Sequence, residues 1–170
     1  NNILIFKDEE SACKKIFDIF IGRHQDIQAE FPQWPYFFQL TTETKSKTGY
    51  GLLKMDESKG TVKLQLDSLL KGVHSNTKCI YLSSPNTVSG QSITKDEFSD
   101  FLTKVPDNVI IYLDQRYFEF SSSKTGVNGR DFIHINPNLF VQRSFNNFYG
   151  IKDLSLSYLM CSPKLFHCVS

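Results

Sequence analysis

The sequence lacks several features that would place it in a specialised class of protein. No apolar run approaches the ~20 residues that a membrane span needs. The N-terminal stretch has no basic region, no long apolar segment and no cleavage site of the kind found in secretory signals. Lys and Arg (19) nearly balance Asp and Glu (18), so the charge gives no reason to expect nucleic acid or an anionic membrane as a partner. We therefore expect a cytoplasmic protein.

Cysteine and histidine are present, but their spacing does not indicate a metal site. Cys13 lies among apolar residues, Cys79 opens an apolar run, and Cys161 and Cys168 do not form a C-x-x-C pair. The 4 histidines are scattered along the chain. We expect structural thiols and no bound metal.

Apolar runs alternate with amphipathic stretches, which is typical of an α/β sheet. We expect residues 1–170 to form a single domain, a three-layer α/β sandwich with a mixed, mainly parallel sheet and helices on both faces. The runs at 79–83 and 109–113 are continuously apolar, as in parallel strands that are covered on both faces. Further strands are expected at 3–6 and 26–30.

Two helices can be predicted in more detail. Residues 94–97 (Thr-Lys-Asp-Glu) form a capping box, and apolar residues then follow at helical spacing up to Pro106. Residues 10–20 are expected to form a helix whose buried side consists of Ala12, Cys13, Ile16, Phe17, Ile19 and Phe20.

Polar residues follow both of the continuous apolar runs. In open α/β sheets the ligand crevice lies beyond the carboxyl ends of the strands. Ser84–Thr87 and Asp114–Tyr117 both follow strand ends, so we expect them to lie at the same edge of the sheet.

Five segments carry motifs that belong together. Residues 79–90 (CIYLSSPNTVSG) resemble a strand followed by N-P-N-N-P-T-G, and residues 109–120 (VIIYLDQRYFEF) resemble a strand that ends in D-E-A-Y-x-x-F. Residues 141–158 (VQRSFNNFYGIKDLSLSY) resemble T-F-S-K-x-Y-G-L-A-G-L-R-x-G-Y. Residues 31–36 resemble P-x-Y-P-x-Y, and residues 2–11 a strand followed by a Gly-Ser turn. In this order and spacing the motifs resemble the pyridoxal-phosphate (PLP)-dependent aminotransferases of class I/II, in their histidinol-phosphate-aminotransferase-like form.

The resemblance implies a set of cofactor-binding residues. Asp114 matches the aspartate that pairs with the pyridine nitrogen, and Tyr117 the tyrosine that binds the ring oxygen. Trp34 stands where an aromatic side chain lines the site. Asn86 matches an asparagine of the N-P-N-N-P motif, whereas Thr87 replaces the asparagine that meets the ring oxygen. Two alternatives stay open: Asp114 could cap a turn, and Trp34 could be a core residue.

Other positions depart from the family. Asn147 replaces the lysine that forms the imine with PLP, and an amide can neither form that imine nor carry the proton. Asp8 and Glu9 replace the phosphate-binding Gly-Ser turn, and Ser155 replaces the arginine that clamps the phosphate. A lost charge-assisted bond costs about 1.5–3 kcal/mol, and a carboxylate ~4 Å from a phosphate opposes it by roughly 4 kcal/mol. We therefore expect PLP not to bind, or to bind weakly.

These departures predict a truncated family member that has lost catalysis and acts as a binding or regulatory module or persists as a remnant. We expect it to lack the family's smaller C-terminal domain, to form a homodimer, and to bind a small molecule if it binds a ligand. The alternative is a weak PLP-dependent aminotransferase that acts on an amino acid and uses Lys152 as a displaced lysine.

Overall fold

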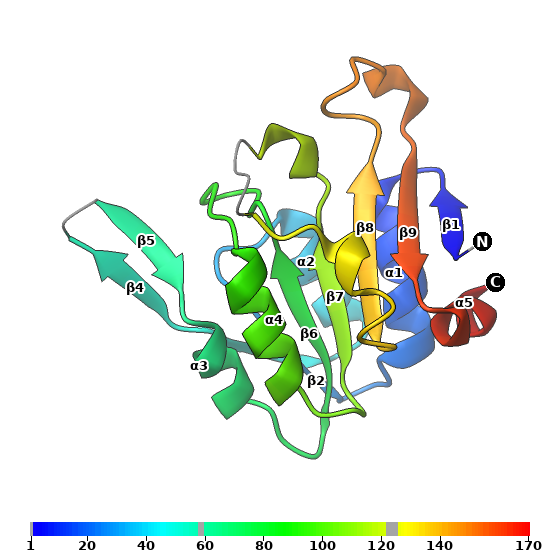
Figure 1. Cartoon of the computed structure of the whole chain (residues 1–170). Coiled ribbons are helices and arrows are strands. Elements are labelled where there is room, and N and C mark those ends of the chain that lie inside the picture. Colours follow the sequence, from blue (N-terminus) through cyan, green and yellow to red (C-terminus); the bar gives the residue numbers. More distant parts are fainter. Residues whose placement is uncertain (1, 58–59, 122–125) are drawn as a thin grey trace.

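The computed structural model describes residues 2–57, 60–121 and 126–170 (Figure 1). The main sheet in the part of the chain that is described has seven strands. Its strands are β1 (Ile3–Phe6), β2 (Asp26–Ala29), β3 (Lys47–Tyr50), β6 (Thr77–Ser83), β7 (Ile110–Asp114), β8 (Leu139–Ser144) and β9 (Ser157–Cys161). They lie in the order β1-β9-β8-β7-β6-β2-β3.

The sheet is mixed and mainly parallel, as the sequence predicted. The neighbouring strands β3, β2, β6, β7 and β8 pair in parallel, with Tyr81 of β6 opposite Tyr112 of β7. The β8–β9 and β9–β1 pairs are antiparallel. The carboxyl ends of β6, β7 and β8 therefore meet at one edge, which is the upper edge in Figure 1.

Helices cover both faces of the sheet (Figure 1). The helices are α1 (Glu9–Phe20), α2 (Pro35–Glu43), α3 (Leu66–Lys71), α4 (Lys95–Lys104) and α5 (Pro163–Val169), with short 3-10 turns η1 (Phe118–Phe120), η2 (Gly129–Phe132) and η3 (Lys152–Leu154). Alternate residues of a strand point to opposite faces, so Tyr81 packs with α1, α2 and α5 while its neighbour Leu82 packs with α3 and α4.

The two helices predicted in detail form at the expected places. The capping box of α4 is complete, with Thr94 and Glu97 each bonded to the backbone of the other. In α1, four of the six expected residues are fully buried and Phe20 packs partly against the core, but Ile19 is 40% exposed, so its predicted burial was wrong. At ~100° per residue, Ile19 lies about 90° from the centre of the apolar stripe, at its margin.

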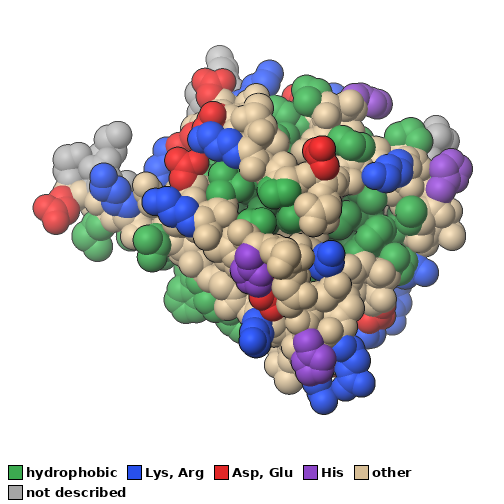
Figure 2. All heavy atoms as spheres, turned by 90° about the horizontal axis from the view of Figure 1, so that it is seen from below, with side chains coloured by type: hydrophobic (Ala, Val, Ile, Leu, Met, Phe, Trp, Pro, Cys, Tyr) green, Lys and Arg blue, Asp and Glu red, His purple; other side chains and the backbone are tan. Residues whose placement is uncertain are grey.

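Two further features complete the outline. Strands β4 (Leu53–Asp56) and β5 (Thr61–Leu64) form an antiparallel hairpin that projects from one side of the sheet (Figure 1). On the face at the amino ends of the parallel strands, basic and acidic side chains are interspersed around a group of hydrophobic ones (Figure 2). Among the described residues, none of the helices has the length and apolar character that crossing a membrane requires.

Gln115 joins the loops that follow β6 and β7. The backbone N–H of Ser84 donates to the carbonyl of Asp114 at 2.9 Å. The buried amide of Gln115 donates to the carbonyls of Ser84 (3.3 Å) and Val127 (2.8 Å), and its oxygen accepts from the N–H of Gly129 (2.9 Å). Asp114 and the loop that begins at Ser84 thus lie at the same edge, as predicted.

Replacing this amide should loosen that edge. We expect Gln115→Ala to lower the free energy of unfolding by about 2–4 kcal/mol, because it leaves buried carbonyls and an N–H without partners. Gln39→Ala, which removes an exposed amide bonded to Glu43, should change it by less than about 0.5 kcal/mol. Denaturant unfolding measures both, and equal losses in the two variants would contradict this role of Gln115.

Candidate functional site

A buried ion pair lies at the carboxyl end of β7. The Nε of Arg116 donates to both carboxylate oxygens of Asp114, at 3.0 and 2.9 Å. Its Nη2 lies 2.7 Å from Oδ2 but is not aligned as a hydrogen bond. The backbone N–H of Arg116 donates to Oδ1 at 3.1 Å, and the hydroxyl of Tyr81 donates to Oδ2 at 2.7 Å. Asp114 is 1% exposed, so the protein rather than water supplies the bonds of this carboxylate.

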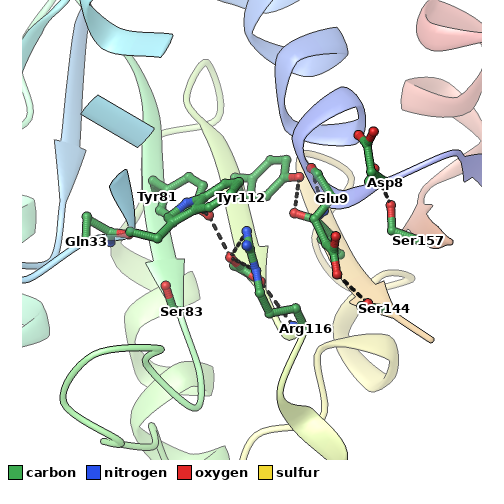
Figure 3. Close-up of polar contacts among 12 residues, drawn as sticks. Asp8, Glu9, Gln33, Tyr81, Ser83, Tyr112, Arg116, Ser144 and Ser157 are labelled. Atoms are coloured by element: carbon green, nitrogen blue, oxygen red, sulfur yellow. Dashed lines mark hydrogen bonds and ion pairs between the residues drawn. The ribbon is translucent and has the colours of Figure 1, made fainter. Parts of the chain in front are cut away.

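Trp34 closes this group of residues. Its Nε1 donates to the hydroxyl of Tyr81 at 3.0 Å. The guanidinium carbon of Arg116 lies 3.6 Å from the centroid of the indole ring, which places the cation over the aromatic face. We call Trp34, Tyr81, Asp114 and Arg116 the Asp114 cluster; Figure 3 shows Arg116 pointing back toward Tyr81 and the end of β7.

The charges in the Asp114 cluster depend on each other. Burial acts to lower the pKa of Arg116, but the charge of Asp114, its hydrogen bond and the nearby phenols together outweigh burial, so the pKa is raised and the guanidinium stays protonated. Burial and the same carboxylate raise the pKa of the Tyr81 phenol well above its usual range, which keeps its proton on the bond to Asp114. Arg116, Asp114 and Tyr81 therefore form a neutral buried unit made of one cation, one anion and one phenol.

A second polar group joins α1 to the end of β8. The carboxylate of Glu9 accepts from the hydroxyl of Ser144, and from the Nδ2 of Asn146 at 3.0 and 3.1 Å. The backbone carbonyl of Glu9 accepts from the Nε2 of Gln142 at 2.9 Å, and the Oε1 of Gln142 accepts from the hydroxyl of Tyr112 at 2.6 Å (Figure 3). At the end of β8, Ser144 and Asn146 thus bind the carboxylate of Glu9, which is a side chain of the same protein.

Asp8 occupies the N-terminus of α1. Its side chain accepts from the N–H of Ser11 at 2.6 Å, and its backbone carbonyl accepts from the hydroxyl of Ser157 at 2.7 Å. A helix N-terminus attracts anions through its free N–H groups and its dipole. Here the carboxylate of Asp8 supplies that anion.

Three other candidate residues share a cleft. Asn86, Thr87 and Tyr117 line a space of about 380 Å³ between the loops that follow β6 and β7. The amide of Asn86 is used by the chain itself: its oxygen accepts from the N–H of Val88 (2.9 Å) and of Ser89 (2.8 Å), and its nitrogen donates to the carbonyl of Pro32 (3.1 Å). The hydroxyl of Thr87 is buried and has no hydrogen-bond partner within the described ranges.

Asn147 makes none of the described contacts with the Asp114 cluster, and unlike the carboxylate of that cluster it is exposed. It is an exposed residue of the turn that follows β8, next to the exposed rings of Phe148 and Tyr149. Ser155 is also exposed, and it adopts a left-handed conformation (φ 35°) just before β9. The side chains at these two positions are uncharged.

The sequence profile of aminotransferases of class I and II matches residues 32–170. The chain belongs to this family. It is 35% identical over 100 residues to histidinol-phosphate aminotransferase 2 of Hydrogenovibrio crunogenus, covering 59% of this chain and 27% of that protein. It is 30% identical over 100 residues to an aromatic amino acid aminotransferase of Cutibacterium acnes, covering 59% and 28%. The match therefore spans only about a quarter of the length of these relatives.

Solved structures of family enzymes share the fold. Histidinol-phosphate aminotransferase of Sinorhizobium meliloti, solved in complex with pyridoxal-5'-phosphate, superimposes with a TM-score of 0.84 at 17% identity, covering 98% of this chain and 44% of that one. Cystalysin of Treponema denticola, which contains the same cofactor, has a TM-score of 0.87 at 15% identity, covering 99% and 43%. The expected PLP-transferase fold is confirmed.

The ring end of a PLP molecule does not fit the site in this conformation. The pyridine nitrogen would need the carboxylate of Asp114, whose oxygens already accept from Arg116 and Tyr81. An aromatic face would be needed for stacking, and the face of Trp34 carries the guanidinium. Arg116 would have to leave before a ring could make either contact.

The phosphate end does not fit either. Ser144 and Asn146 hold the carboxylate of Glu9, and Asp8 caps the helix N-terminus. A phosphate charge about 4 Å from such a carboxylate is opposed by roughly 4 kcal/mol at an effective dielectric near 20. A PLP molecule would therefore meet anions where it needs hydrogen-bond donors and cations.

The sequence comparison overlooked Arg116, although a signal was present. In the motif D-E-A-Y, Arg116 occupies the position of the alanine. A long cation in the usual place of a short side chain, two residues after Asp114, can fold back onto that carboxylate. The roles of Tyr81 and Glu9 depend on contacts across the sheet, so no local motif indicates them.

Glu30 is a further buried carboxyl at this edge of the sheet. It accepts a hydrogen bond from the N–H of Ser83 and lies 3.5 Å from the amide nitrogen of Gln33. Burial raises the pKa of Glu30 to about 7, although hydrogen bonds from Ser83 and Asn86 oppose the shift. The folded state therefore favours the protonated form.

Stability should consequently fall as the pH rises. Between the ordinary glutamate pKa of about 4.5 and the folded value of about 7, the folded state binds more protons than the unfolded state. The free energy of unfolding should then drop on the order of 3 kcal/mol as the pH rises from about 4.5 to about 7, and level off above that pH. Glu30→Gln should remove this dependence, whereas Glu10→Gln at an exposed position should keep it. Denaturant unfolding at pH 5 and pH 8 provides the measurement, and an unchanged slope in Glu30→Gln would count against it.

Proposed function

We propose that this chain is a noncatalytic member of the class I/II aminotransferase family that acts as a binding or regulatory module. The observation that carries the proposal is the end of β8, where Asn146 holds the carboxylate of Glu9 and Asn147 follows as an exposed amide. In the motif of the family, the same strand end offers the lysine amine that forms the imine with the cofactor.

The chemistry of the side chains supports this proposal. Imine formation needs an amine nucleophile, and the amide nitrogen of Asn147 has its lone pair delocalised into the carbonyl. The carboxylate of Glu9 opposes the phosphate that would bring PLP to the strand end. We therefore propose that PLP binds weakly or not at all.

A small molecule is the ligand that this proposal favours. The cleft lined by Asn86, Thr87 and Tyr117 has a volume of about 380 Å³, which falls within the range of small-molecule sites. Thr87 and Tyr117, which line it, offer one polar and one aromatic side chain.

The purified protein should not form keto acids from amino acids at saturating PLP. Asn147→Lys alone should also remain inactive, because Asp8 and Glu9 still occupy the phosphate end and misplacement of a reacting group by about 1 Å can cost roughly 100-fold. Keto-acid formation from a panel of amino acids measures this, with Lys152→Ala as the matched control. Multiple turnover by the unmodified chain that Lys152→Ala abolishes would establish the displaced-lysine enzyme instead.

We also propose that the protein forms a dimer. Exposed apolar side chains lie together beyond the end of β8, where Phe120 packs edge-to-face on Phe148 (5.3 Å) and Phe148 on Tyr149 (5.4 Å). Phe120, Phe148 and Tyr149 are each about half exposed, and a second copy would cover them.

Sedimentation should detect this association. We expect the weight-average mass to rise toward that of a dimer with concentration, and Phe148→Glu to shift the protein toward monomer by placing a charge in the apolar contact. Ile135→Glu changes a side chain that is 73% exposed and follows η2, away from the aromatic group, so it should leave the association unchanged. A monomer at all concentrations would refute the dimer.

A further inference from the structure

We propose that Trp34, Tyr81 and Asp114 form a binding site for a planar cation, and that the chain's own Arg116 is the occupant of this site. The proposal concerns the pocket that remains if Arg116 is removed. It does not depend on the loss of catalysis, which is proposed from the end of β8.

The contacts of Arg116 are those that a separate ligand would make. One edge of the guanidinium faces the carboxylate of Asp114, with Nε 2.9 and 3.0 Å from its oxygens. One flat face lies 3.6 Å from the centroid of the Trp34 ring. An edge contact to an anion and a face contact to an indole together select a flat, delocalised cation over a spherical ammonium group.

The remaining wall of the site is built independently of Arg116. Tyr81 donates to Asp114 at 2.7 Å and accepts from the indole N–H of Trp34 at 3.0 Å. Its ring stacks on that of Tyr112 at 5.1 Å between centroids and 9° between planes. These contacts hold the carboxylate and the indole in place from the sheet side, so the pocket should keep its shape when the cation is exchanged.

The Arg116 side chain can be removed and replaced by an added cation without removing the backbone contact that anchors this turn. The backbone N–H of Arg116 donates to Asp114 at 3.1 Å, which anchors this turn without the guanidinium. Shortening the side chain to alanine restores the residue of the D-E-A-Y motif and empties the space between the indole and the carboxylate. The variant Arg116→Ala is therefore the form in which the site can be tested with added cations.

The experiment uses the fluorescence of Trp34, which is the one tryptophan of the chain. Arg116→Ala should change the Trp34 emission and lower the thermal midpoint, since it leaves a buried carboxylate without its cation. Ethylguanidinium should reverse both changes and saturate at roughly millimolar concentration, as expected for a ligand of this size. Ethylammonium at the same ionic strength should reverse neither, and the unmodified protein should respond to neither cation.

Two further variants complete the test. Asp114→Asn combined with Arg116→Ala removes the anion as well, so ethylguanidinium should have no effect on it. Arg116→Lys keeps the charge but not the plane, and it should show the altered Trp34 emission without being rescued. If Arg116→Ala does not fold in buffer, ethylguanidinium and not ethylammonium should restore the yield of folded protein on refolding. Equal responses to both cations, or rescue of the double variant, would overturn the proposal, whereas transaminase activity of the unmodified chain would overturn only the proposed function.

Discussion

The buried pair of Asp114 and Arg116 is the interaction on which the carboxyl edge of the sheet depends. A carboxylate that is taken out of water must be paired, and removing one partner of such a pair typically costs about 3–5 kcal/mol. Because Asp114 ends β7 and Tyr81 lies on the neighbouring β6, satisfying this one charge fixes the two strands relative to each other. Trp34, from the segment before α2, is drawn into the same group through Tyr81.

The alternation of residues along the strands explains why the polar groups gather on one side. Tyr81 and Tyr112 point toward α1 and α2, whereas their neighbours Ile80 and Ile111 point into the apolar layer under α4. The phenol of Tyr112 continues the polar row through Gln142 to Glu9 at the start of α1. Hydrogen bonds thus connect the sheet to the helix that, in the family's pattern, opens the phosphate end of the site.

Local signals in the sequence predicted the strands with continuous apolar runs, the capping box at Thr94 and the meeting of the two loops. They missed β8 and β9, whose apolar residues are interrupted by polar ones that find partners only in the folded sheet, such as Gln142 and Ser157. The family motifs singled out Asp114 and Trp34, and the structure brings both residues into one group through Tyr81 and Arg116, but the motifs describe residues that a cofactor needs. Arg116 departs from the motif, and its contacts with Asp114 and Trp34 form only in the folded chain. The motif therefore does not predict the role of Arg116.

A cation that is covalently part of the chain stabilises the folded state differently from a cation that can dissociate. A protein that is stabilised by a bound ligand loses that stabilisation as the ligand becomes scarce, in proportion to the logarithm of its concentration. The guanidinium of Arg116 is covalently attached two residues from the carboxylate that it neutralises, so its effective concentration is set by the chain and does not vary with supply. The folded state then carries its counter-charge with it through synthesis, dilution and turnover.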